Sequence, residues 1–139
     1  MPNWCMNEVT FYFEDEETRD DFLKSVEDWV EISTDLGGKL HTQKEHSVFR
    51  FNKILPMPVD DEDFDWHEWC GRNWGTKWEP VLVLFDRPDK LSVYMEMYTA
   101  WSPPLGIYEK LHEDWEHRGM SCDWFYREDG IQVAGWLPH

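Results

Sequence analysis

Hydrophobic and polar residues recur along the first part of the chain in patterns that predict a strand followed by a helix. Residues 8–13 combine β-branched and aromatic side chains, which is typical of a strand. The acids of residues 14–17 suit the positive end of a helix dipole. The apolar positions that follow have helical spacing and would form one stripe facing a sheet: Phe22, Leu23, Val26, Trp29 and Val30.

The middle of the chain is interrupted by glycines, prolines and acids. Glycines at residues 37–38 break the helical pattern, and residues 48–52 alternate as a second strand that two prolines bring to an end. Residues 60–65 are predicted to form an acidic loop. Apolar residues at near-helical spacing then predict a short helix that ends at Gly75; they are Trp66, Trp69, Cys70 and Trp74.

The second half of the chain predicts two hairpins. Residues 81–85 and 91–98 are strand-like runs on either side of a turn that contains Pro and Asp. In the second of these runs four apolar residues share one face: Leu91, Val93, Met95 and Met97. Residues 122–126 and 131–136 flank a Glu-Asp-Gly turn and predict the other hairpin.

A further helix is predicted between the two hairpins. Ser102 is a suitable N-cap with Pro103 at the first helical position, and an amphipathic pattern follows until Gly119. The predicted order is β-α-β-(α)-β-β-α-β-β, which indicates an α+β fold with helices on one face of a mostly antiparallel sheet. Because 139 residues suffice for one core and not for two ordinary domains, residues 1–139 are expected to form a single domain.

The charge of the chain restricts its partners. It carries 29 acidic residues against 13 basic ones, a formal net charge of −16. An acidic surface repels phosphate backbones, so we expect no direct binding to nucleic acid and consider a basic protein surface the expected partner. The aromatic content of 17% distinguishes the chain from disordered acidic tails.

The cysteines and the N-terminus bear on the compartment. Cys5, Cys70 and Cys122 are far apart and odd in number, which does not indicate a disulfide framework, so reduced thiols in a cytoplasm are expected. The N-terminus has no basic start and no apolar stretch of signal length, and no run approaches the ~20 apolar residues of a membrane span. No pattern predicts an oligomeric state.

No constellation of residues points to a cofactor, a metal or a catalytic reaction. His67 and Cys70 would share a helix face, but structural zinc usually takes four ligands and no second pair is present. His112 and His117 are five residues apart, whereas the zinc-protease motif needs histidines four apart. We therefore expect neither an enzyme nor a resident cofactor.

Several short segments are rich in Trp, Pro, Gly and Asn: residues 1–5, 51–58, 73–78, 99–104 and 134–135. Their content and order resemble the YubB-like ferredoxin-like domain family, whose members are carried by plasmids and bacteriophages and are largely of unknown function. The resemblance covers nearly the whole chain and implies a ferredoxin-like fold without an iron–sulfur cluster, and a mobile-element origin. It supplies no catalytic residues. The chain departs from the pattern at Met6 and in the acidic residues 60–65, which weakens the transfer of a shared ligand.

These segments also predict a candidate ligand site beside the start of the last helix. Indole rings would form flat walls, and free backbone N–H groups with an ammonium and a hydroxyl would favour a small anion or a carboxylate. The candidate residues are Asn3, Trp4, Asn73, Lys77, Trp78, Thr99, Trp101 and Ser102. The alternative is that the rings belong to the core and that the polar residues satisfy buried backbone groups.

Acidic surfaces predict a second candidate site, for a protein partner. Its residues are Asp60, Asp61, Glu62, Asp63 and Asp65 of the loop and Glu16, Glu17, Asp20 and Asp21 of the first helix. A row of carboxylates can compete with DNA, which carries one charge per ~1.7 Å of axis. Together with the resemblance, this suggests a phage or plasmid accessory protein that inhibits a nucleic-acid-binding defence protein of the host. The alternatives are a solvated face that confers solubility and a ligand-binding module built on the Trp site.

Overall fold

The fold is built on a five-stranded antiparallel sheet with the strand order β4-β5-β1-β6-β7. A computed structural model describes residues 3–58 and 64–138. The strands of the sheet are β1 (Trp4–Tyr12), β4 (Val81–Asp86), β5 (Ser92–Ala100), β6 (Ser121–Glu128) and β7 (Val133–Trp136). The predicted α+β class, the mostly antiparallel sheet and both hairpins of the second half are therefore confirmed.

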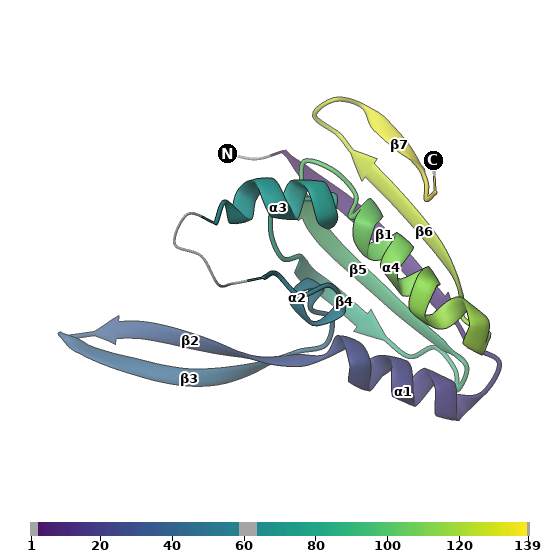
Figure 1. Cartoon of the computed structure of the whole chain (residues 1–139), viewed down its shortest axis with the longest axis horizontal. Coiled ribbons are helices and arrows are strands. Elements are labelled where there is room, and N and C mark those ends of the chain that lie inside the picture. The colour runs from purple at the N-terminus through teal and green to yellow at the C-terminus, as the bar shows by residue number, and fades with distance from the viewer. Residues whose placement is uncertain (1–2, 59–63, 139) are drawn as a thin grey trace.

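Helices lie over one face of this sheet (Figure 1). They are α1 (Glu16–Val26), α2 (Phe51–Ile54), α3 (Trp66–Asn73) and α4 (Leu105–Trp115), which is followed by the short 3-10 helix η1 (Glu116–Arg118). The predicted short helix that ends at Gly75 is confirmed as α3, and Gly75 adopts a positive φ of 88° there. Within residues 3–58 and 64–138, no helix is long and apolar enough to span a bilayer.

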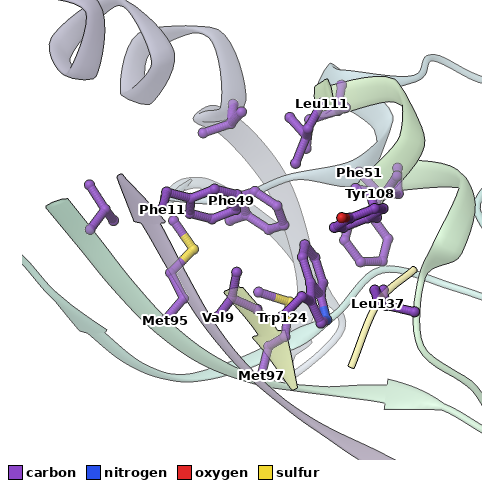
Figure 2. Close-up of a cluster of buried hydrophobic side chains, with 14 of the residues drawn as sticks. Val9, Phe11, Phe49, Phe51, Met95, Met97, Tyr108, Leu111, Trp124 and Leu137 are labelled. Atoms are coloured by element: carbon purple, nitrogen blue, oxygen red, sulfur yellow. The ribbon is translucent and has the colours of Figure 1, made fainter. Parts of the chain in front are cut away.

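The core lies between these helices and the covered face of the sheet. On β1 every second side chain from Cys5 to Phe11 is fully buried, and the side chains between them point to the opposite face. Figure 2 shows the Phe11 ring beside that of Phe49 in this cluster. The centroid of Phe11 lies 6.2 Å from that of Trp124, with the two rings at an angle of 90°. The Phe22 ring of α1 approaches Phe11 to 4.8 Å. Aromatic pairs of this kind stabilise a core by about 0.5–1.5 kcal/mol beyond their burial.

The first helix ends earlier than the sequence predicted. α1 ends at Val26, and Trp29 and Val30, which the helical spacing assigned to the same stripe, lie in a strand, β2 (Asp28–Leu36). The run after Asp28 contains Val30, Ile32 and Thr34, and β-branched side chains favour the extended backbone over the helix. The early end of α1 therefore starts a second, separate sheet.

A projecting hairpin, which we call the β2–β3 arm (residues 28–47), was not predicted. β2 pairs along its full length with β3 (Lys39–Ser47), and the two strands form a sheet of their own. Gly37 and Gly38 join them with φ values of 64° and 83°, the backbone conformation that a two-residue hairpin turn requires. Figure 1 shows the arm extending away from the body of the molecule.

The strand predicted at residues 48–52 is wrong. Phe49 and Phe51 are buried in the core, and the chain turns into α2 at Phe51. The cause is a distant side chain: the Glu79 carboxylate accepts hydrogen bonds from the backbone N–H groups of Phe51 at 2.6 Å and Asn52 at 2.9 Å. These two donors therefore cap a helical turn and do not join a strand ladder.

Replacing Glu79 with Ala should lower the free energy of unfolding by about 2–4 kcal/mol, because two backbone donors lose a charged acceptor. The Arg50 guanidinium, whose Nε lies 3.3 Å from Glu79, would lose its ion-pair partner as well. Urea denaturation measures the change. Glu109→Ala, at an exposed position of α4, is the matched control and should stay within about 0.5 kcal/mol of the parent protein. Equal losses in the two variants would contradict this assignment.

Candidate functional site

The predicted convergence of the N-terminus with the two Trp segments is confirmed. The Trp101 N–H donates to the Asn3 carbonyl at 2.8 Å, which ties the start of β1 to the end of β5. The Ser102 hydroxyl donates to the carbonyl of Gly75, which ties the same turn to the end of α3. Segments about 25 and 100 residues apart in the sequence therefore meet at one end of the sheet.

Exposed rings gather at this end, on the sheet face opposite to the helices. The centroid of Trp4 lies 6.3 Å from that of Trp78 and 6.4 Å from that of Tyr98, in edge-to-face contacts. Trp4, Val81 and Tyr98 line a depression of about 200 Å³. We call Trp4, Trp78, Val81 and Tyr98 the aromatic patch. Trp4 keeps 40% of its surface exposed, which is a large apolar area to leave in water.

A cation and a strained backbone lie beside the aromatic patch. The Lys77 ammonium is 5.2 Å from the centroid of the Trp101 ring, within the range of a cation–π contact. Trp101 has a positive φ of 71°, a left-handed conformation that bulky residues rarely adopt. Strain of this kind persists where the surroundings enforce it, and it often marks a functional position.

A buried polar network enforces this conformation. Thr99, which is fully buried, donates its hydroxyl to the Ser102 carbonyl at 2.7 Å and accepts a hydrogen bond from Asn7 Nδ2 at 2.9 Å. Asn7 Nδ2 also approaches the Cys5 and Met97 carbonyls, at 3.1 and 3.3 Å, and its Oδ1 accepts from Trp124 Nε1 at 2.9 Å. Thr99 is therefore a core residue that shapes the turn at Trp101.

The start of α4 does not offer the free donors that the anion hypothesis requires. The backbone N–H groups of Gly106 and Ile107 donate to the Trp74 carbonyl at 3.0 and 3.4 Å. Gly106 permits this contact, because a Cβ atom there would lie 1.7 Å from the carbonyl oxygen of Asn73. The donors that an anion would use are already bonded within the fold.

Ser102 was wrongly predicted to be the N-cap of this helix. α4 begins at Leu105 after Pro104, without a side-chain cap. A residue that precedes a proline avoids the helical conformation, and both Ser102 and Pro103 precede one. The helix consequently starts two residues later than predicted, which leaves the Ser102 hydroxyl for Gly75.

Asn73 and Asn3 form hydrogen bonds with backbone groups of the fold, which is the alternative to ligand binding that the sequence analysis gave. Asn73 Nδ2 donates to the Trp69 carbonyl at 3.0 Å within α3. Asn3 contributes its carbonyl to the Trp101 N–H, and its side chain lies against Gly130 in the β6–β7 turn. Of the predicted ligand residues, Trp4, Trp78, Lys77 and Trp101 are thus brought together at the surface, and ligand binding by them stays a prediction.

Two carboxylates lie at the centre of the same open face, and the sequence analysis did not identify them. Glu8 of β1 is the direct cross-strand partner of Glu96 of β5. The Tyr94 hydroxyl donates to Glu96 Oε1 at 3.0 Å. Burial, this hydrogen bond and the charges of Glu96 and Glu8 raise the pKa of Tyr94 to about 12. Alternation along each strand places both acids outside the core, but only the register shows that they face each other.

The acids predicted to bind a partner have different surroundings. On α1, Arg19 pairs with Asp20 at 3.0 Å and with Glu16 at 3.6 Å, and Arg118 pairs with Asp21 at 2.9 Å, while Glu17 lies in the first turn. Asp65 accepts from the Glu68 N–H as the N-cap of α3. Asp60, Asp61, Glu62 and Asp63 lie outside the described residues. Arginines therefore offset several α1 charges.

The thiols are held in their protonated form. Burial raises the pKa of Cys5 and of Cys70 to about 11 and that of Cys122 to about 12. A thiol with so high a pKa is a poor nucleophile at neutral pH. In the part of the chain that the structure describes, no three His, Cys, Asp or Glu side chains gather in a metal-binding group.

Replacing Asn7 with Ala should lower the free energy of unfolding by about 2–4 kcal/mol, because the Trp124 N–H and the Thr99 hydroxyl lose a buried partner. Thermal or urea unfolding followed by tryptophan fluorescence measures the loss. Thr10→Ala, on the open face of the same strand, controls for side-chain truncation in β1 and should cost less than about 1 kcal/mol.

The backbone strain at Trp101 predicts that a Gly variant is more stable than an Ala variant at this position, the reverse of the usual order. Trp101→Gly should be more stable than Trp101→Ala by about 1 kcal/mol, because only glycine adopts a positive φ without steric cost. Both variants lose the same ring, so their difference isolates the backbone effect. Equal stabilities, or a more stable Ala variant, would show that the turn relaxes when the ring is removed.

The chain matches no protein-family model, no curated protein and no solved structure. The capacity of this surface follows from its own geometry, which combines exposed rings, a Lys77–Trp101 contact and a facing pair of carboxylates. Rings and carboxylates together suit a cationic or amphipathic partner.

Proposed function

We propose that this protein is a non-enzymatic interaction domain whose open sheet face binds a basic segment of another protein. The support comes from the Glu8–Glu96 pair, which lies on the central strand β1 and on its neighbour β5. Like charges directly opposite each other on neighbouring strands destabilise a sheet by about 0.2–1 kcal/mol. Among the described residues, neither carboxylate forms an ion pair with a base. A guanidinium or ammonium from a partner would relieve their repulsion.

The aromatic patch extends this face toward one end. Tyr98 follows Glu96 by two residues on the same face of β5, so a cation at the carboxylates would have a ring beside it. Arginine combines bidentate bonds to carboxylates with stacking on aromatic faces. The depression bounded by Trp4, Val81 and Tyr98 has room for an apolar side chain of the same partner. An arginine-rich segment with an apolar anchor therefore fits the face best.

The proposed contact surface is the open sheet face and not the acidic surface of α1. Arg19 and Arg118 offset the charges of Glu16, Asp20 and Asp21 on α1. The open face carries its two central acids without such neutralisation. In its more specific form, the proposal is that the basic partner is a nucleic-acid-binding protein of the host. The chain would then act as a decoy that occupies the nucleic-acid-binding surface of that protein.

We also propose a ferredoxin-like core for this chain. Leaving the β2–β3 arm and β7 aside, the strands are ordered β4-β5-β1-β6, so the first and third strands of the unit are central. α1 follows the first of them and α4 follows the third. This order supports the motif resemblance and, with it, the proposal of an accessory protein of a phage or plasmid in the host cytoplasm.

A second candidate function is the binding of a small aromatic or anionic molecule at the aromatic patch. The depression of about 200 Å³ and the Lys77 ammonium over Trp101 favour it. A ligand at 100 times its dissociation constant would stabilise the protein by ~2.7 kcal/mol, which a thermal-shift screen detects. Stabilisation that Trp4→Ala abolishes would favour this second function.

The double variant Glu8→Gln/Glu96→Gln tests the proposed function. We expect the free energy of unfolding to rise by about 0.2–1 kcal/mol, because the like-charge contact is removed while Tyr94 keeps an acceptor. Binding of an arginine-rich peptide, followed by tryptophan fluorescence at low salt, should weaken at least tenfold. A pull-down from host lysate at low ionic strength extends the measurement to natural partners.

The matched control removes the same charge from the helix side of the molecule. Glu109→Gln/Glu113→Gln on α4 alters two exposed acids and should leave peptide binding within about twofold of the parent protein. Equal weakening by both double variants would reduce the interaction to net charge and would overturn a site on the open face.

A further inference from the structure

The β2–β3 arm is not part of the proposed binding surface on the open sheet face, and it exposes much apolar surface to water. Every residue from 31 to 46 is exposed. Trp29, Leu36 and Leu40 expose 63%, 60% and 72% of their surface. A two-stranded hairpin on its own is marginally stable, and each of its strands has an unpaired edge. The arm is thus built to be covered.

β3 has an edge suited to pairing with another strand. It contains nine residues, its pairing with β2 runs without a bulge, and it contains no proline. Bulges and prolines are two of the devices that protect an edge strand, and charged side chains such as Lys39 and Lys44 of β3 are another. The edge strand β4, in contrast, has an irregularity between Leu82 and Leu84 and follows Pro80. Figure 1 shows the arm clear of the main sheet.

We propose that β3 pairs antiparallel with β3 of a second copy of this chain, about a two-fold axis that passes through Gln43. Only one antiparallel register pairs all nine residues of the strand with their counterparts. In that register His41 faces Glu45 of the second copy, and by symmetry the reverse contact also forms. Lys39 faces Ser47, and Lys44 faces Thr42. No like charges are opposed, so the strand is complementary to itself.

The same register adds an apolar contact across the interface on one arm face. His46 already pairs with Trp29 across the arm, with a ring separation of 5.2 Å, and its Nε2 lies 2.9 Å from a Glu27 oxygen. In the proposed pairing Leu40 of the second copy lies directly beside His46. A continuous row of Trp29, His46 and Leu40 then crosses the interface on each side of the axis. Leu40, which has the highest exposed fraction among the large apolar residues that the structure describes, is shielded in this way.

Symmetry favours a second copy over an unrelated protein. An interface about a two-fold axis uses each favourable contact twice, and a self-complementary strand supplies both halves without a second sequence. The interface is small, because edge pairing of nine residues gives less than the standard ~800 Å² per partner. We therefore place it in the weak, concentration-dependent class.

A cysteine on the axis tests the register. In Gln43→Cys the two new thiols would lie directly opposite each other, with Cβ atoms about 4.5–5.5 Å apart, and mild oxidation should give a covalent dimer of the full chain. Ser33→Cys, at an exposed position of β2 on the far side of the arm, is the matched control and should stay monomeric. Equal cross-linking of the two variants would overturn the register.

Opposite substitutions at His41 test the contact energetics without cross-linking. Sedimentation equilibrium of the full chain at up to about 1 mM, in ~0.15 M salt to screen the repulsion between copies, should show reversible dimers. His41→Glu places like charges opposite Glu45 at two symmetric sites and should weaken association roughly tenfold. His41→Lys places an opposite charge beside Glu45 at the same two sites and should retain association. A wild-type protein that stays monomeric throughout, or dimers indifferent to His41→Glu, would refute the proposal.

Discussion

The side chain of Asn7 is the interaction on which the rest of the structure depends. It lies fully buried on the central strand and connects three strands, through β1 and β5 carbonyls, the Thr99 hydroxyl and the Trp124 indole. A buried amide without partners would cost several kcal/mol, so this network specifies which strands are neighbours and how deeply Trp124 is inserted. Through Thr99 it reaches the Ser102 carbonyl and fixes the turn that carries Trp101.

The two faces of the sheet differ in the side chains that they carry. The covered face is packed with rings and has satisfied polar groups, whereas the opposite face carries opposed acids and an exposed aromatic patch, and a left-handed tryptophan follows the end of β5. Each of these features is unfavourable locally, and natural proteins tolerate such features mainly at functional positions. The β2–β3 arm is also locally unfavourable, because it exposes apolar residues and has no core of its own.

Several features were readable from the sequence because they depend on near neighbours. Acids and apolar spacing predicted the start of α1, Gly75 predicted the end of α3, and turn residues predicted both hairpins. The prediction for residues 48–52 failed because a distant group decides: Glu79 caps a helical turn there from 27 residues away. The helical stripe predicted through Trp29 ends at Val26, because the β-branched residues after Asp28 favour a strand, which pairs with β3. The prediction that Ser102 is the N-cap of α4 failed for a local reason, because two prolines follow it.

The sequence by itself determined the fold class and the strongly acidic charge, because composition and short-range periodicity carry that information, and the order of its Trp-containing motifs led to the prediction that these segments meet. The tertiary structure alone decided which of these residues are exposed. It buried Thr99 and left Trp4 at the surface, satisfied the start of α4 with the Trp74 carbonyl, and set Glu8 opposite Glu96. Strand register and long-range hydrogen bonds set these outcomes, and no pattern within a short window of sequence contains them.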